Sequence, residues 1–142
     1  KTLLSHMPTD LRICLVGEGA TDLIAELDLP SDMLIDGYDE LSHCDLIAKI
    51  RLSVVLVNCS LHESYCITLV EALVCKCKVV TTPVGIGKYL ASISQNVRCV
   101  SWEIKQFLID IDDALKSDFV SENFDFTWDS VLAKSQVLSN AS

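Results

Sequence analysis

The sequence has few basic residues and no long hydrophobic run. Eleven Lys and Arg residues stand against twenty Asp and Glu residues, which gives a net charge of −9. Nucleic acids and anionic membrane surfaces are bound through clustered basic side chains, so we expect neither as a binding surface for this chain. The apolar residues occur in short runs, none of which has the length of a membrane-spanning helix. The beginning of the sequence also lacks the continuous apolar segment of a signal peptide.

The seven cysteines have no spacing that is typical of disulfides or of zinc sites. An odd number with irregular spacing is a poor disulfide framework. The one close pair, Cys75 and Cys77, has no second pair near it and does not fit the common zinc motifs. Cys14, Cys59 and Cys99 sit in apolar runs, where cysteine acts as a small hydrophobic residue. These features predict a reduced protein of the cytoplasm, with structural thiols and without a metal.

The 142 residues, half of them hydrophobic, are enough for one domain that spans residues 1–142. Short runs rich in Val, Ile and Leu do not alternate strictly with polar residues, which is typical of strands covered on both faces. Five such runs are found at residues 12–16, 33–36, 54–58, 78–82 and 97–101. Helical segments are expected at residues 20–27, 43–52, 65–75, 88–94, 103–116 and 128–138. This alternation predicts an α/β fold with one doubly wound, Rossmann-like parallel sheet of about five strands.

Four of the loops that are expected to follow strands contain glycine or polar residues. In parallel sheets, ligands bind outside the carboxyl ends of the strands, so these loops mark the expected binding edge. Gly17, Gly19 and Gly85 let the backbone approach a ligand closely there. The start of each following helix offers free amide groups that suit a phosphate. Ser64 is the residue that we expect to cap the helix over residues 65–75.

Glu63 and Glu71 are the most informative pair of residues in the sequence. The first is placed at a strand-to-helix turn and the second two turns into the helix. Eight helical steps separate two side chains by roughly 80° around the axis and about 12 Å along it. Both carboxylates could therefore face one crevice and touch different parts of an elongated ligand. Glu71 has only apolar neighbours between Leu69 and Val74, and a lone acid in such a helix indicates a ligand or a partner.

Two other patterns have simpler explanations. The segment Gly17–Gly19 begins like the dinucleotide fingerprint G-x-G-x-x-G, but Asp22 stands at the third glycine position. We interpret this segment as a tight turn rather than as an NAD site. His62 beside Glu63 suggests acid–base chemistry, although a loop histidine is more often a hydrogen-bonding or surface residue.

Several of these segments together resemble a known family. Residues 60–73 are similar to the E-x7-E signature of family 4 retaining glycosyltransferases, in the C-terminal domain of their GT-B fold. Residues 15–19, 34–38 and 79–85 resemble strand-and-loop segments of that domain. Residues 126–128 resemble the start of its closing helix. Within the family, residues 57–66 look closest to the branch that transfers N-acetylglucosamine to phosphatidylinositol, the first step of GPI-anchor synthesis. The resemblance covers nearly the whole chain.

The resemblance implies that the chain binds a UDP-sugar, with UDP-GlcNAc as the expected donor substrate. Glu63 would be the catalytic residue, beside the donor sugar, where it would support the departing sugar–phosphate. Glu71 would accept hydrogen bonds from the ribose hydroxyls. The backbone of Tyr38 would lie against the base, which is expected to be uracil. Enzymes of this family retain the anomeric configuration of the sugar.

The resemblance also implies how the diphosphate is held. Backbone amides at the start of a helix would face it, namely those of Cys66, Ile67 and Thr68. Further donor contacts are expected in the loops of the same edge, from Gly17, Gly19, His62, Ser64 and Gly85. No metal and no cofactor are expected, because helix dipoles and basic side chains stabilise the leaving diphosphate in this family.

The sequence departs from the family pattern in ways that bear on function. Cys66 and Lys76 stand where the family usually has glycine, and Lys78 stands where it usually has proline. The resemblance implies that the sequence begins after the first strand–helix unit of the domain, which carries the family's basic diphosphate clamp. We therefore expect an N-terminal acceptor domain or a companion subunit as a partner, and a membrane lipid as one kind of acceptor. The rest of such an enzyme would place the domain at the cytosolic face of the endoplasmic reticulum.

Three interpretations remain open from the sequence. The favoured one is the nucleotide-sugar-binding half of a glycosyltransferase, which is inactive alone because GT-B chemistry takes place in a cleft between two domains. The second is a non-catalytic, degenerate module of the same fold that binds a partner protein. The third is an unrelated flavodoxin-like binding domain, which requires the helix with Glu71 to face solvent.

Overall fold

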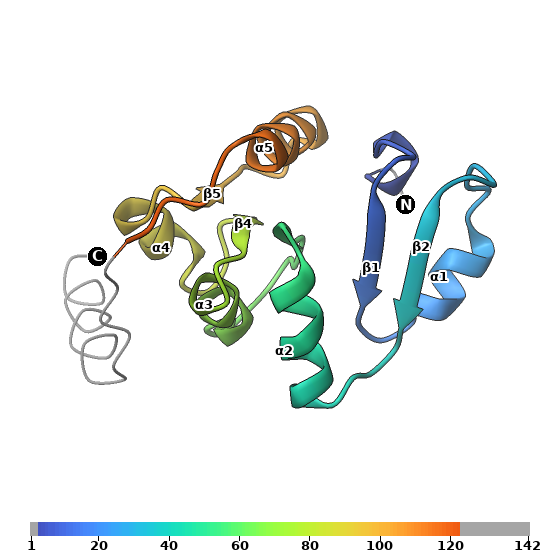
Figure 1. Cartoon of the computed structure of the whole chain (residues 1–142), viewed down its shortest axis with the longest axis horizontal. Coiled ribbons are helices and arrows are strands. Elements are labelled where there is room, and N and C mark those ends of the chain that lie inside the picture. Colours follow the sequence, from blue (N-terminus) through green and yellow to red (C-terminus); the bar gives the residue numbers. More distant parts are fainter. Residues whose placement is uncertain (1–2, 123–142) are drawn as a thin grey trace.

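The computed structural model describes residues 3–122 of the chain, in which strands and helices alternate (Figure 1). After a short 3-10 helix at Leu4–His6, the elements are β1 (Arg12–Val16), α1 (Ala20–Glu26), β2 (Leu34–Tyr38), α2 (His43–Leu52), β3 (Val55–Asn58), α3 (Ile67–Val74), β4 (Lys78–Thr81), α4 (Gly87–Ile93), β5 (Val97–Cys99) and α5 (Ile104–Lys116). The expected α/β alternation is confirmed, and the helix expected at 128–138 lies outside the described residues. No helix between residues 3 and 122 is long and apolar enough to cross a membrane.

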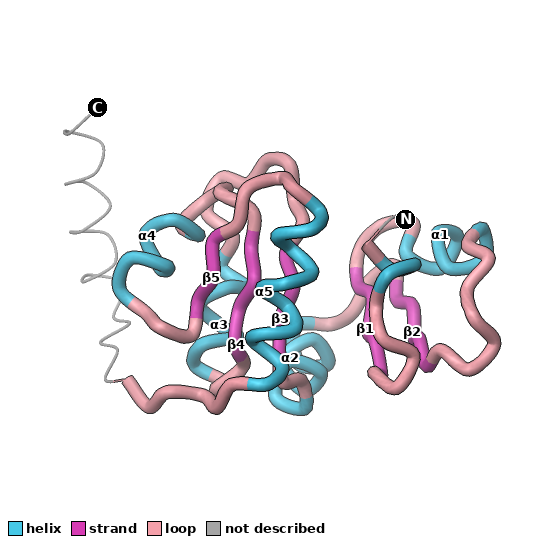
Figure 2. The backbone as a smooth tube through the Cα atoms, turned by 90° about the horizontal axis from the view of Figure 1, so that it is seen from above, coloured by secondary structure: helices cyan, strands magenta, loops and turns pink. Residues whose placement is uncertain are grey.

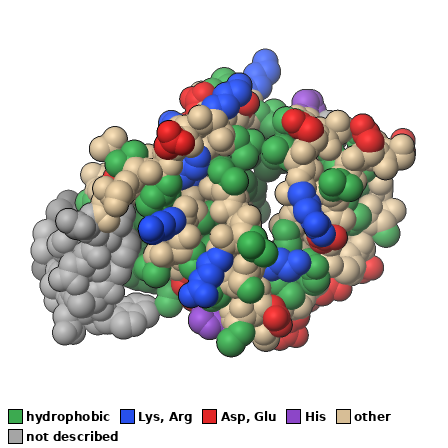
Figure 3. All heavy atoms as spheres, in the orientation of Figure 1, with side chains coloured by type: hydrophobic (Ala, Val, Ile, Leu, Met, Phe, Trp, Pro, Cys, Tyr) green, Lys and Arg blue, Asp and Glu red, His purple; other side chains and the backbone are tan. Residues whose placement is uncertain are grey.

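The five strands do not form the single sheet that the sequence analysis predicts. β1 pairs with β2 in one parallel sheet, and β3, β4 and β5 form a second parallel sheet in that order. The prediction of one five-stranded sheet is therefore wrong. Figure 2 shows β1 and β3 as the inner strands of the two sheets, and Figure 3 shows an opening between the two parts. The inner edges of β1 and β3 carry no strand-to-strand hydrogen bonds to each other.

The first sheet is covered well on only one of its two faces. Gly37 faces α1 so closely that an added Cβ atom would lie 2.6 Å from the side chain of Ile24. On the opposite face, Val16 and Leu34 are exposed to 39% and 60%. Strands covered on both faces were expected here, and this half-open face departs from that expectation.

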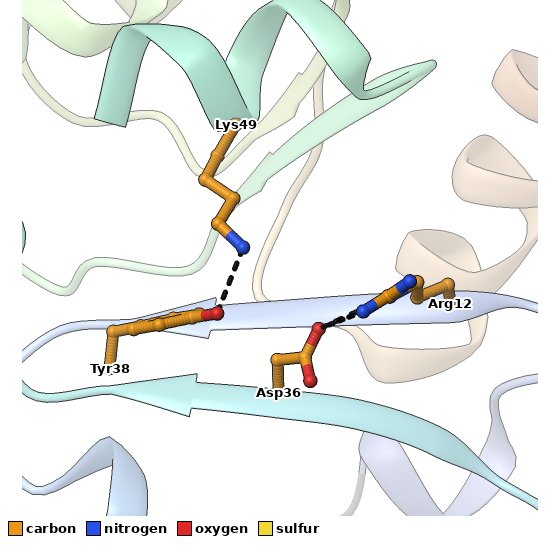
Figure 4. Close-up of polar contacts among 4 residues, drawn as sticks. All are labelled: Arg12, Asp36, Tyr38 and Lys49. Atoms are coloured by element: carbon orange, nitrogen blue, oxygen red, sulfur yellow. Dashed lines mark hydrogen bonds and ion pairs between the residues drawn. The ribbon is translucent and has the colours of Figure 1, made fainter. Parts of the chain in front are cut away.

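Polar contacts occupy the open face of the first sheet (Figure 4). The Arg12 guanidinium donates to Asp36 Oδ2 at 2.9 Å, which joins β1 to β2. Lys49, from α2, donates from Nζ to the hydroxyl of Tyr38 at 2.9 Å and lies 4.5 Å from the centre of its ring. The hydrogen bond to Tyr38 is the main cause that raises the pKa of Lys49. This contact links the first sheet to the helix that leads into the second.

The second sheet contains the main hydrophobic core. All four residues of β4 are buried, and neighbouring side chains point to opposite faces. Val79 packs in a cluster with Leu69 and Leu90 from α3 and α4. Val80 packs in another cluster with Phe107 and other residues of α5. Figure 1 shows α5 and α3 on opposite sides of this sheet. The expectation of strands covered on both faces is thus met by β4, the central strand.

Lys76, just after the end of α3, has a backbone conformation that is unfavourable for a residue other than glycine. Its φ angle is +62°, in the left-handed region that favours glycine. The amide of Cys77 donates to the carbonyl of Ala72 at 2.8 Å, and the amide of Lys76 donates to that of Leu73 at 3.0 Å. These two bonds form a Schellman motif, in which the left-handed position is usually glycine.

We expect Lys76→Gly to stabilise the protein by about 1 kcal/mol, because glycine removes the left-handed penalty while the two capping bonds remain. The change in free energy of unfolding is measured by urea denaturation. Lys76→Ala is the matched control, since it removes the charge and the long side chain but keeps the Cβ atom. An equal gain from alanine would show that the side chain, rather than the backbone conformation, is the source.

Candidate functional site

A pocket of about 670 Å³ lies beyond the carboxyl ends of β3, β4 and β5. Three loops form its walls, one after each of these strands. The lining residues are Leu61, His62, Glu63, Ser64, Pro83, Val84, Gly85 and Trp102. Four of them are residues for which the sequence predicts a donor contact or a catalytic role, namely His62, Glu63, Ser64 and Gly85. The pocket therefore occupies the edge at which parallel sheets bind ligands.

The side chain of Asn58, the last residue of β3, organises the loop that carries Glu63. Its Nδ2 group donates to Thr81 Oγ1 at 3.2 Å and to Cys66 Sγ at 3.5 Å. Its Oδ1 atom accepts from the amide of Ser60 at 3.3 Å and from the hydroxyl of Ser60 at 2.9 Å. One amide group thus connects the end of β3 with β4, with the start of the loop and with the start of α3.

Glu63 is exposed to solvent but is held in place from one side. The hydroxyl of Ser60 lies 2.7 Å from Glu63 Oε1, and its single hydrogen can be donated either to this carboxylate or to Asn58 Oδ1. The carbonyl of Ser60 in turn accepts from Thr82 Oγ1 at 2.7 Å, and Thr82 is almost fully buried. A carboxylate is therefore fixed on the wall of an open pocket through a chain of contacts that ends in the core. Such a group can accept hydrogen bonds from hydroxyls or stabilise a developing positive charge.

The start of α3 differs from the expected one. The helix begins at Ile67, and the capping position is Cys66, with a φ angle of +64° and no capping bond from its side chain. The prediction that Ser64 caps the helix is wrong, because the chain stays irregular for two residues longer and Ser64 faces the pocket instead. Burial raises the pKa of the Cys66 thiol to about 11, and the charge of Glu63 acts in the same direction.

Gly85 brings two loops of the pocket into direct contact. Its φ angle is +53°, and an added Cβ atom would lie 2.4 Å from the carbonyl oxygen of Tyr65. The next amide, that of Ile86, donates to the same carbonyl at 3.0 Å. The glycine is therefore required for the packing of the loop after β4 against the loop after β3. Sequence reasoning expects a ligand at Gly85, and the structure adds a neighbouring backbone as a second reason for glycine.

Glu71 lies outside the pocket, on the part of α3 that faces α2. Its Oε1 atom is 2.7 Å from Nε2 of His43, the first residue of α2. The Glu71 side chain is 18% exposed, whereas that of His43 is 72% exposed. The flavodoxin-like interpretation requires Glu71 to face solvent, and this largely buried side chain does not fit it. Ile67 is exposed and Thr68 half-buried in the first turn of the same helix.

Gly17, Gly19 and Tyr38 lie at the carboxyl edge of the first sheet and do not line the pocket. The amide of Gly17 donates to the carbonyl of Tyr38 at 3.0 Å. At the start of α1, Asp39 accepts from the amide of Thr21 at 3.0 Å and from its hydroxyl at 2.6 Å, and these bonds lower the pKa of Asp39. A carboxylate of the protein thus already occupies a helix start at which a phosphate was considered. The interpretation of 17–19 as a turn fits this arrangement.

Three residues of this region were missed by sequence reasoning. Asn58 was seen only as part of a similar segment, although a polar residue that ends an apolar strand is a signal for a role at the binding edge. Trp102 follows the expected strand at 97–101, so its place could have been inferred from the same rule. His43 gave no signal, because its contact with Glu71 depends on how α2 packs on α3. Among the residues that the structure describes, no cluster of His, Cys, Asp and Glu could hold a metal ion.

We expect iodoacetamide to alkylate Cys66 slowly at pH 8, because a raised pKa keeps its thiol protonated at that pH. Glu63→Gln should accelerate the reaction at fixed pH, since the loss of a negative charge lowers the pKa of Cys66. Mass spectrometry of the peptides gives the rate at each cysteine. The exposed Cys44 on α2 serves as the internal control, with a rate that does not change in the variant. An unaltered rate at Cys66 would contradict the charge coupling.

We expect Asn58→Ala to lower the free energy of unfolding by about 1–3 kcal/mol, because it leaves part-buried partners in the loop and in β4 without their hydrogen bonds. Urea denaturation measures the effect. Ser92→Ala is the control: it removes one hydrogen bond of an exposed hydroxyl on α4 and should change stability by less than about 0.5 kcal/mol. Equal effects of the two substitutions would mean that Asn58 does not organise the loop.

No protein-family model matches the chain, and no curated protein or solved structure matches it either. A function can therefore be inferred only from the chemistry of the pocket and of the two glutamates.

Proposed function

We propose that this chain is the nucleotide-sugar-binding half of a retaining glycosyltransferase of the GT-B type, with a UDP-sugar as donor and UDP-GlcNAc as the first candidate. The observation that carries the proposal is the pocket at the carboxyl ends of β3, β4 and β5, with Glu63 on its wall. The pocket volume of about 670 Å³ is in the range of small-molecule sites. A sugar is small enough for this volume, and its hydroxyls suit the polar residues of the lining.

The position of Glu63 suits a sugar more than it suits a phosphate. Its carboxylate would repel a diphosphate but accepts hydrogen bonds from sugar hydroxyls. Retaining transfer passes through a sugar with positive charge on its anomeric carbon, and a nearby carboxylate stabilises that charge. The contact with Ser60 keeps the carboxylate in one place before the ligand arrives, so little reorganisation is needed. We assign the sugar to the pocket and the catalytic role to Glu63.

Glu71 suits the other end of the same ligand. Its carboxylate is mostly buried beside α2 and lies outside the pocket. Ribose hydroxyls are good donors to such a group. The diphosphate would then lie between the two glutamates, at the start of α3, where the amides of Ile67 and Thr68 are placed. A phosphate at a helix start is stabilised by the helix dipole and by free amides.

The backbone gives separate support for the family. The structure has two residues other than glycine with positive φ among those described, Cys66 at +64° and Lys76 at +62°. Both are positions at which family 4 glycosyltransferases usually have glycine. The chain thus keeps the backbone conformation of a glycine where the residue itself has changed. The left-handed conformation at Lys76 also follows from its Schellman motif, so Cys66 is the more specific of the two positions.

We expect calorimetric titration to detect binding of UDP and UDP-GlcNAc to the full chain. Glu71→Ala should weaken the binding of both ligands by about 10- to 100-fold, since it removes charged hydrogen bonds to the ribose. The control is Asp113→Ala. Asp113 is an exposed acid on α5, so this substitution removes the same charge far from the ligand. Intact binding of UDP by the Glu71→Ala variant would refute the assignment of the ribose. Transfer of the sugar requires the second domain and is not expected here.

A partner-binding module of the same fold is the second candidate. Two contacts favour it, because protein groups already occupy places that a ligand would use. Glu71 is engaged by His43, and the amide of Thr21 is engaged by Asp39. Cys66 also adds a side chain near the expected diphosphate. Absence of any heat from UDP or UDP-GlcNAc in a folded chain would favour this candidate over the enzyme half.

A further inference from the structure

The loop after β5 contributes an aromatic ring to the pocket, whereas Glu63 comes from the loop after β3. Trp102 follows β5 and is 48% exposed, although it is the largest side chain in the pocket lining. Large apolar side chains are usually withdrawn from solvent, and an exposed indole inside a pocket is a common feature of binding sites. The polar residues His62, Glu63 and Ser64 line the same pocket. One ring and several polar groups thus surround one space.

The same strand fixes both of these walls. On one side, the amide of Val100 donates to the carbonyl of Thr81 at 2.8 Å, two residues before Trp102. On the other side, Thr82 donates to the carbonyl of Ser60, whose hydroxyl contacts Glu63. Thr81 and Thr82 are both buried at the end of β4. The backbone at Val100 and at Ser60, close in the chain to the indole and to the carboxylate, is therefore held by the buried end of β4.

A hexose ring has the surface that such a pair of walls would bind. Its C–H groups form an apolar face that packs on an aromatic ring, while its hydroxyls lie around the edge and donate to carboxylates. A nucleobase also stacks on indole, but the ribose end of the ligand is assigned to Glu71, which lies outside the pocket. The base is bonded directly to the ribose, so the proposed function assigns both to the Glu71 end of the ligand. The sugar is the part of the donor that remains for Trp102.

We propose that Trp102 is a specificity-determining residue that stacks on the sugar ring of the donor, opposite the carboxylate of Glu63. This inference rests on the proposed function and adds a contact that neither the sequence pattern nor the family resemblance assigns. It predicts that Trp102 contributes to the binding of UDP-GlcNAc and contributes nothing to the binding of UDP. The ratio of the two affinities is therefore the quantity that reports on Trp102.

The test is calorimetric titration of the full chain with UDP and with UDP-GlcNAc. Trp102→Ala should weaken UDP-GlcNAc about five- to tenfold and leave UDP unchanged, which is the effect of losing one stacked ring. Trp102→Phe keeps a ring and should stay within about twofold of the wild type for both ligands. Ile104→Ala is the matched control, because Ile104 is also exposed, lies two residues further on, and does not line the pocket.

The outcomes separate the inference from the proposed function. Binding of UDP-GlcNAc that is unchanged in the folded Trp102→Ala variant overturns the role of Trp102 and leaves the proposed function standing. Equal weakening of both ligands also overturns it, since the residue would then act on the fold of the site. A wild-type chain that binds neither ligand overturns the proposed function and the inference with it. A loss confined to UDP-GlcNAc, and rescued by phenylalanine, supports the stacked sugar.

Discussion

The side-chain amide of Asn58 is the contact on which the rest of the candidate site depends. It uses both of its ends, since Nδ2 donates to Thr81 and Cys66 while Oδ1 accepts from Ser60. Thr81 belongs to the neighbouring strand β4, Cys66 lies at the start of α3, and Ser60 lies in the loop between β3 and α3. The loop between β3 and α3 is irregular and has no strand-to-strand hydrogen bonds of its own. A side chain therefore supplies hydrogen bonds that fix its backbone. Glu63 stands in that loop and takes its position from this amide through Ser60.

The second constraint is the separation of the two sheets. A two-stranded sheet is marginal without other packing, and here α1 covers one face while Arg12, Asp36, Tyr38 and Lys49 cover part of the other with polar contacts. The second sheet has its own core on both faces and does not need the first for its pocket. The residues expected to bind a donor are therefore divided. His62, Glu63, Ser64 and Gly85 share the pocket, whereas Gly17, Gly19 and Tyr38 belong to the other sheet.

Local patterns in the sequence were enough to predict most of the strands and helices and the sheet edge at which the pocket lies. Hydrophobic runs gave β1 its observed bounds and β4 to within one residue, and α2 was expected over its observed range of 43–52. These predictions rely on near neighbours in the chain, which the sequence shows directly. The separation of β1 and β3 into two sheets could not be read in this way, because a run of Val and Leu does not say which strand lies beside it. The start of α3 was misplaced for a related reason: the contacts of Cys66 and Tyr65 with β3 and with the loop at 85–86 come from distant residues.

The spacing of the two glutamates explains why one ligand could use both in spite of their different surroundings. Glu63 lies before α3 begins and Glu71 lies in the second turn of α3, so the two are separated by the start of the helix and not by the eight helical steps that the sequence analysis assumes. The first faces the pocket and the second faces α2. A compact ligand would reach only one of them. A ligand with a sugar at one end, a ribose at the other and a charged linker between them would pass the start of α3 on the way, where amide groups are the favourable partners for that charge. The His43 side chain, largely exposed beside Glu71, is a group that such a ligand would have to share or displace.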